Sequence, residues 1–130
     1  MKEKLLNLLN NSYSPYSNYP VAAVLVTKDG KEFYGVNVED ASYRAGTCAE
    51  RNAIFAYLTA GYKKNDIKEI HIMVSGSDIG TPCGTCRQMI YEICDRDTLI
   101  RCYNKSGDYQ DFTIDELCPH FFGESNLEWK

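Results

Sequence analysis

The sequence has no long apolar run, no cluster of basic residues and only two histidines. No stretch of about eighteen apolar residues is present, so we expect no membrane-spanning helix. The chain carries 14 lysines and arginines against 18 aspartates and glutamates, a net charge of −4. Because no basic run could follow a phosphate backbone, nucleic acid is not expected as the main partner.

The N-terminal segment MKEKLLNLLNNSYSPYS lacks the features of a secretory signal peptide. Its apolar run is short, and Glu3 interrupts the basic start. We therefore expect a cytoplasmic protein. In a reducing compartment, cysteines are more typical of metal binding, catalysis or core packing than of disulfides. The six cysteines stand at positions 48, 83, 86, 94, 102 and 118.

The order of apolar patterns predicts an α/β protein. Helical patterns cover 3–10, 48–61, 83–94 and a short segment ending at 118; strand patterns cover 21–27, 31–38, 69–75, 98–104 and 109–114. Either Thr113 or Asp115 could cap the last helix, which Pro119 ends. This order predicts a mixed sheet with helices packed on it. Because 130 residues contain no internal repeat and no long linker, we expect one domain over 1–130.

Two short segments, TCAERNAIF and TPCGTCRQMIYEI, place three cysteines at predicted helix starts. Helix N-termini present free N–H groups and partial positive charge, which stabilise the thiolates that bind zinc. A Cys-x-x-Cys pair at a helix start can put Cys83 and Cys86 on one ion. A third thiolate from Cys48 would leave the fourth tetrahedral position open, as in catalytic zinc sites.

Glu50 lies two residues after Cys48, in the first turn of the same predicted helix. From there its carboxylate can take a proton from a water at the open position, which is the task of a general base. Three thiolates give a Zn²⁺ site a formal charge of −1 and make such a water less acidic. We expect the helix N-termini and Arg51 to offset this charge, Arg51 by donating hydrogen bonds to thiolates.

Two other kinds of site are compatible with these cysteines. A thioredoxin-like redox pair would use Cys83 and Cys86 but would leave Glu50 without a role. A structural zinc site would need a fourth ligand. The candidates for that ligand are Cys94, Cys102, Cys118, His71 and His120. We expect the first four to be core residues and His120 to be an ordinary surface or packing residue.

The two cysteine motifs resemble the zinc deaminase signature in its three-cysteine form. PYSNYPVAAVLVTKDGKEFYGVNVEDASY, CAERNAIF, PCGTCRQMIYE and ELCPHFFGESNL resemble the small homotetrameric cytidine deaminases, over residues 13–127 and in the same order. The resemblance implies a three-layer α/β/α fold with a mixed five-stranded central sheet. It also implies one Zn²⁺ per subunit, held by Cys48, Cys83 and Cys86, with Glu50 as the proton shuttle.

The resemblance further implies a nucleoside site that is shared between the subunits of a homotetramer. Asn37 and Glu39 match the positions that bind the ribose 3′-hydroxyl, and residues two apart on a strand share a face. Ala49 would offer its backbone to the base, and Tyr19 stands where the family usually has a phenylalanine near sugar and base. Phe122 matches the tail aromatic that enters a neighbouring subunit's site and stacks on the base.

The implied function is zinc-dependent hydrolytic deamination of cytidine and deoxycytidine to uridine and deoxyuridine, with release of ammonia, in pyrimidine salvage. One alternative is a deaminase of a related cytosine-containing compound such as blasticidin S; another is an RNA-binding editor. NVEDAS and FFGES favour the nucleoside, and the acidic charge balance disfavours RNA. Departures from the family's usual residues occur at Tyr19, Ala22, Asp40, Arg44 and Thr81.

Overall fold

A computed structural model describes residues 1–127 of the chain. The elements are α1 (Lys2–Leu9), β1 (Val21–Thr27), β2 (Glu32–Val36), α2 (Ala49–Thr59), β3 (Ile67–Val74), α3 (Gly84–Ile93), β4 (Leu99–Tyr103), β5 (Tyr109–Phe112), α4 (Ile114–Leu117) and the 3₁₀ turn Glu124–Asn126. Their order confirms the predicted succession of helices and strands. No helix in the described part is long and apolar enough to cross a bilayer.

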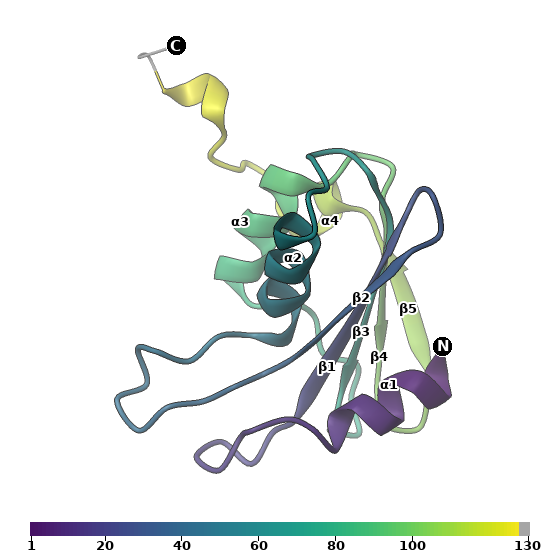
Figure 1. Ribbon diagram of the computed structural model, residues 1–130, viewed down its shortest axis with the longest axis vertical. Coiled ribbons are helices and arrows are strands. Elements are labelled where there is room, and N and C mark those ends of the chain that lie inside the picture. Colours follow the sequence, from purple (N-terminus) through teal and green to yellow (C-terminus); the bar gives the residue numbers. More distant parts are fainter. Residues whose placement is uncertain (128–130) are drawn as a thin grey trace.

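The five strands form one mixed sheet in the order β2-β1-β3-β4-β5 (Figure 1). The pair β3 and β4 is parallel, and α3 is part of the crossover that joins them. The other three strand pairs are antiparallel. The mixed five-stranded sheet is therefore the one that was expected, with β3 at its centre between β1 and β4.

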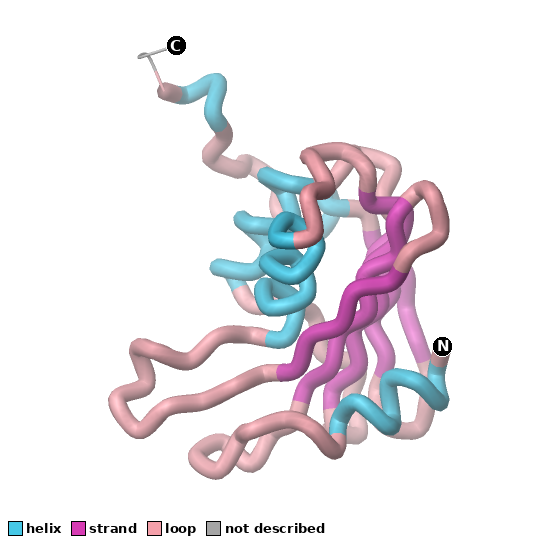
Figure 2. Tube along the Cα trace, in the orientation of Figure 1, coloured by secondary structure: helices cyan, strands magenta, loops and turns pink. Residues whose placement is uncertain are grey.

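Helices cover both faces of this sheet, which gives three layers (Figure 2). On one face, Leu5 and Leu9 of α1 pack against β1, β3 and β4. On the other face, α2 and α3 pack against the same strands through residues that include Ala53, Ile54 and Ile90. Successive side chains of β1 alternate between the two clusters, because a strand has a period of two. This architecture confirms the predicted three-layer α/β/α fold.

Two local predictions are refined by the structure. Thr113, and not Asp115, caps α4: its hydroxyl accepts a hydrogen bond from the Glu116 N–H, and the Glu116 carboxylate accepts one from the Thr113 N–H. The strand predicted over 31–38 already ends at Val36. Beyond that residue only Val38 forms isolated bridges, because the chain turns away into the long loop that leads to α2.

Candidate active site

The three candidate metal ligands stand at the starts of two helices. Cys48 is the N-cap residue of α2, Cys83 is the N-cap residue of α3, and Cys86 lies in the first turn of α3. Neither N-cap residue uses its side chain to cap its helix. The thiols are therefore free for a ligand, in the partial positive charge of two helix N-termini.

The sulfur atoms of Cys48, Cys83 and Cys86 all lie within 4.8 Å of one another. The Sγ atoms of Cys48 and Cys83 are 3.6 Å apart. Tetrahedral zinc with Zn–S bonds of about 2.3 Å would separate two sulfurs by about 3.8 Å. The distances and the soft thiol donors thus fit a zinc ion, and the other side chains of the described residues leave the fourth position open.

The remaining cysteines and both histidines lie apart from this cluster. Cys94 and Cys102 are buried in the core, and Cys118 is half-buried. The buried His71 ring is hydrogen-bonded to the Tyr103 hydroxyl at 2.8 Å and to the Glu69 carboxylate at 3.0 Å. His120 is exposed. The expectation that these groups are packing or surface residues is therefore confirmed for His71, His120 and the two buried cysteines.

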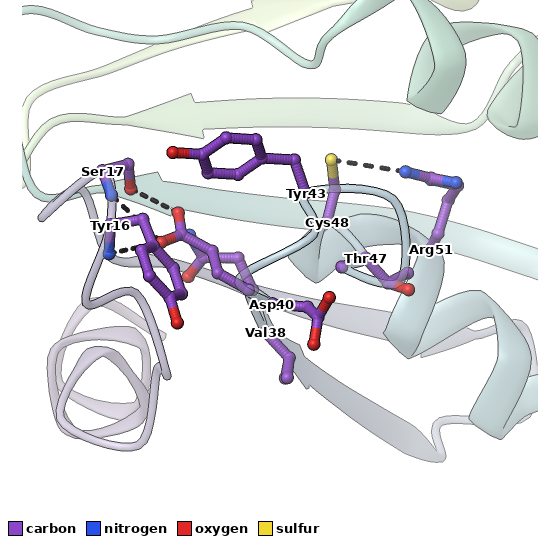
Figure 3. Close-up of a pocket in the computed structure, with 11 residues that line it drawn as sticks. Tyr16, Ser17, Val38, Asp40, Tyr43, Thr47, Cys48 and Arg51 are labelled. Carbon is purple, nitrogen blue, oxygen red and sulfur yellow. Dashed lines mark hydrogen bonds between the residues drawn. The ribbon is translucent and has the colours of Figure 1, made fainter.

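The surroundings of the thiol cluster favour the ionised form of Cys48 and the protonated form of Cys86. A hydrogen bond with the Cys86 thiol and a second one with the Arg51 guanidinium lower the pKa of Cys48 to about 5. The same sharing of a proton with Cys48, together with burial, raises the pKa of Cys86. Arg51 Nη2 lies 3.6 Å from Cys48 Sγ, and Figure 3 shows the guanidinium beside the sulfur. Among residues 1–127, the buried Nε atom of Arg51 has no hydrogen-bond partner.

Glu50, the second residue of α2, is only 5% exposed. Burial raises the pKa of its carboxyl group to about 7. A carboxyl group with such a pKa can both accept and return a proton near neutral pH. Glu50 lines the same cavity as Cys48 and Cys83, so an acid–base group and two of the three thiols face one space.

This cavity has a volume of about 270 Å³. It is lined by Ser17, Tyr19, Val21, Asn37, Glu39, Cys48, Ala49, Glu50, Ile72, Val74, Gly80, Thr81 and Cys83. No lysine, arginine or histidine of the described chain contributes to the lining. A second, more open cavity of about 440 Å³ adjoins it and shares Ser17, Asn37, Glu39 and Cys48 (Figure 3). Four of the five predicted substrate-binding residues therefore line the cavity that contains Glu50.

Asn37 and Glu39 reach this cavity while holding the loop before β1. Asn37 Oδ1 accepts a hydrogen bond from the Val21 N–H at 2.9 Å, and its Nδ2 donates one to the Tyr19 carbonyl at 2.9 Å. Glu39 Oε1 accepts two hydrogen bonds, one from the backbone N–H of Tyr16 and one from that of Ser17, both at 3.0 Å. These bonds fix the shape of the wall at which Asn37 and Glu39 would meet a ligand.

Phe122 is the predicted substrate-binding residue that does not line this cavity. Its side chain is 57% exposed, and its carbonyl accepts a hydrogen bond from Gln88 of α3. The neighbouring Phe121 stacks on Tyr91 with ring centroids 3.6 Å apart. Trp129, part of the same aromatic tail, falls outside the described residues.

Two residues that position the site were not singled out from the sequence. Arg87 donates hydrogen bonds of 2.7 Å to the Pro82 carbonyl, the Leu117 carbonyl and Thr81 Oγ1, and thereby fixes the turn before Cys83. Gly35 allows β2 to approach the first turn of α2. A glycine inside a strand pattern often marks such a close backbone approach, and that signal was present in the sequence.

Comparisons with known proteins agree with this geometry. Residues 1–102 match the model of the cytidine and deoxycytidylate deaminase zinc-binding region. The chain is 40% identical over 116 residues to a cytidine deaminase of Halalkalibacterium halodurans, covering 89% of this chain and 86% of that protein. It is 32% identical over 123 residues to a cytidine deaminase of Mycoplasma genitalium, covering 95% and 93%.

The fold of this chain is also similar to that of a solved cytidine deaminase. The structure superposes on the crystal structure of cytidine deaminase from Burkholderia pseudomallei with a TM-score of 0.85 and 36% sequence identity. That match covers 94% of this chain and 99% of the other. Because the model of the zinc-binding region matches residues 1–102, which are most of this chain, the chain belongs to the cytidine and deoxycytidylate deaminase family.

Proposed function

We propose that this protein is a zinc-dependent hydrolase that converts cytidine and deoxycytidine to uridine and deoxyuridine, with water consumed and ammonia released. One observation carries the proposal. Three thiols at two helix starts converge beside a buried carboxyl group whose pKa lies near 7, and this carboxyl group, Cys48 and Cys83 line one cavity. The relatives named cytidine deaminase support the same reaction.

In this proposal Cys48, Cys83 and Cys86 hold the zinc ion, which when bound supplies a Lewis acid that makes a water molecule a nucleophile near neutral pH. Glu50 takes a proton from the attacking water and delivers it to ring nitrogen N3. A carboxyl group of pKa about 7 can then pass a proton to the amino group that leaves C4. The N–H of Ala49, the first residue of α2, has no acceptor within that helix and would hold the base edge.

The lining of the cavity favours a nucleoside over a nucleotide. Among residues 1–127 it offers no cationic side chain, and it contains the Glu39 carboxylate. A phosphate group would meet repulsion there and would have no charge-assisted donor. Cytidine and deoxycytidine are therefore better candidates than their 5′-phosphates, although the family includes deoxycytidylate deaminases.

We further propose that residues 1–130 act as one domain within a homotetramer whose subunits share their sites. Phe122 is exposed and lies outside the cavity of its own chain. The open cavity beside Cys48 is bordered by Tyr16, Val38 and Tyr43, which are also exposed. A neighbouring subunit's Phe122 would cover this apolar surface.

We place the enzyme in pyrimidine salvage in the cytoplasm. All six cysteines carry free thiols, which suits a reducing compartment. The site that uses three of them also depends on reduced sulfur, because a disulfide cannot supply thiolate ligands.

The experiment follows the ultraviolet absorbance of cytidine with purified zinc-loaded protein and with Glu50→Ala as the paired variant. We expect the cytidine band to disappear with the native protein and to persist with Glu50→Ala, while both proteins retain zinc. A native protein that holds zinc but leaves cytidine unchanged would refute the proposed substrate.

A further inference from the structure

An aromatic stack joins the tail that follows α4 (119–127) to the body of its own chain. The ring of Phe121 lies on that of Tyr91 of α3, with centroids 3.6 Å apart and an interplanar angle of 26°. The Arg96 guanidinium lies 5.1 Å from both ring centroids, within the range of cation–π attraction. Arg96 in turn donates hydrogen bonds to the Tyr91 hydroxyl and to Asp115 of α4. The first part of the tail is therefore tied to both α3 and α4.

Beyond Phe121 the tail is held more weakly. Lys64 Nζ lies 3.8 Å from the Glu124 carboxylate, but both side chains are about half exposed, so this ion pair contributes little. Gly123, Glu124 and Ser125 line a cavity of about 410 Å³ between the tail and the end of α3. These residues border a hollow instead of packing closely on the helix. We therefore expect the stack of Phe121 to be the contact that most restrains the tail.

The stack also sets the direction in which Phe122 points. Phe121 is half-buried against Tyr91, whereas the side chain of Phe122 is 57% exposed. Gln88 of α3 donates a hydrogen bond to the Phe122 carbonyl, which holds the backbone next to the stack. A Cβ atom at the buried Gly123 would lie 3.2 Å from the ring of Phe121, so the chain passes close over that ring. With one ring fixed on α3, the next ring faces away from its own subunit.

On the basis of the proposed function, we propose that Phe121 is a positioning residue for the shared site. By stacking on Tyr91 of its own subunit, Phe121 holds Phe122 in the orientation in which the Phe122 ring enters the site of a neighbouring subunit. Without this stack the tail would adopt several orientations, and ordering it against a neighbour would cost conformational entropy.

The test is a double-mutant cycle of Phe121→Ala and Phe122→Ala in the zinc-loaded protein, measured as kcat/KM for cytidine. We expect Phe121→Ala to lower kcat/KM by about 2- to 10-fold, the range for the loss of one aromatic pair. In a chain that already carries Phe122→Ala, the same substitution should cause no further loss, because no ring remains to be positioned. Phe121→Tyr keeps a ring that can stack and should rescue the native value.

Amide hydrogen exchange over residues 119–127 gives a second measurement that does not depend on turnover. Exchange should be faster in Phe121→Ala than in the native protein. It should also be faster in the double variant than in Phe122→Ala, because the stack lies within one chain. Unfolding temperature and zinc content show whether each variant is folded, and Phe121→Leu takes the place of Phe121→Ala if the latter is not.

The outcomes separate the anchor from the proposed function. A native protein without activity on cytidine would overturn the proposed function itself. An active native protein whose Phe122→Ala variant is equally active would overturn the shared site, and the positioning role with it. If Phe122→Ala is impaired, the role of Phe121 is overturned by a Phe121→Ala variant with native activity, or by one whose loss is equally large in both backgrounds.

Discussion

Gly35 on β2 and Ala49 at the start of α2 meet at a backbone-to-backbone contact. A Cβ atom at Gly35 would overlap the Ala49 carbonyl oxygen and would lie 2.6 Å from the amide nitrogen of Ala53. The Asn52 side chain strengthens the contact with a 2.7 Å hydrogen bond to the Val36 carbonyl. Because Cys48 and Glu50 flank Ala49, this contact sets the position of both.

Gly35→Ala should therefore disturb the fold and the site together. We expect a loss of unfolding free energy of about 1–3 kcal/mol, typical of overpacking against a backbone that cannot move away. We also expect weaker zinc retention, because α2 must shift with Cys48. Denaturant unfolding and metal analysis measure the two effects.

Gly84→Ala is the matched control for this substitution, because a Cβ atom there meets nothing within 4 Å and the residue is helical. The control should fold with unchanged or slightly higher stability. If Gly35→Ala and Gly84→Ala were equally stable, this result would contradict the close contact between Gly35 and the first turn of α2.

Arg51 should support the metal site through its hydrogen bond to Cys48. We expect Arg51→Ala to weaken zinc affinity by about 10- to 100-fold or to lower activity, as for other residues that support metal ligands. Competition with a chromogenic chelator measures the affinity. Arg44→Ala, a change at an exposed arginine outside both cavities, is the control for lost charge. Full activity with full zinc in Arg51→Ala would exclude this role.

The contribution of Arg87 to stability should depend on the planar shape of its guanidinium group as well as on its charge. It joins the turn before α3 to the end of α4 through three hydrogen bonds. Arg87→Lys keeps the charge but cannot make the same set of bonds. We expect a loss of about 1–3 kcal/mol in denaturant unfolding. A variant as stable as the native protein would show that the three bonds contribute little.

We expect Phe122 to contribute to the active site of a neighbouring subunit. Subunits that carry Phe122→Ala and subunits that carry Glu50→Gln should each be nearly inactive alone. When the two are unfolded together and refolded as mixed assemblies, some sites should combine an intact Glu50 with an intact neighbouring Phe122. We expect turnover to recover in the mixture, and a mixture as inactive as its parents would argue against shared sites.

Truncation after Cys118 gives a second test of assembly. The removed segment contains the aromatic tail that would cover a neighbouring subunit. We expect the truncated chain to lose both assembly and turnover in sedimentation and activity measurements. A monomeric truncated chain with full activity is the result that this proposal forbids.

The sequence by itself determined the order of the elements and the pattern of candidate ligands, because both depend on local spacing. Apolar periods of two and 3.6 residues mark strands and helices, and the cysteines precede helix starts within a few residues. The free state of the thiols was expected on a different ground, because the N-terminal segment lacks the features of a signal peptide and indicates a reducing compartment. These features survive in the structure with shifts of a few residues at the element ends.

The tertiary structure decided what depends on residues far apart in the chain. Asn37 bonds to Tyr19 and Val21, Arg87 reaches Leu117, and Gly35 meets Ala49. None of these pairs is visible in local periodicity, since each exists only after the sheet has brought distant segments together.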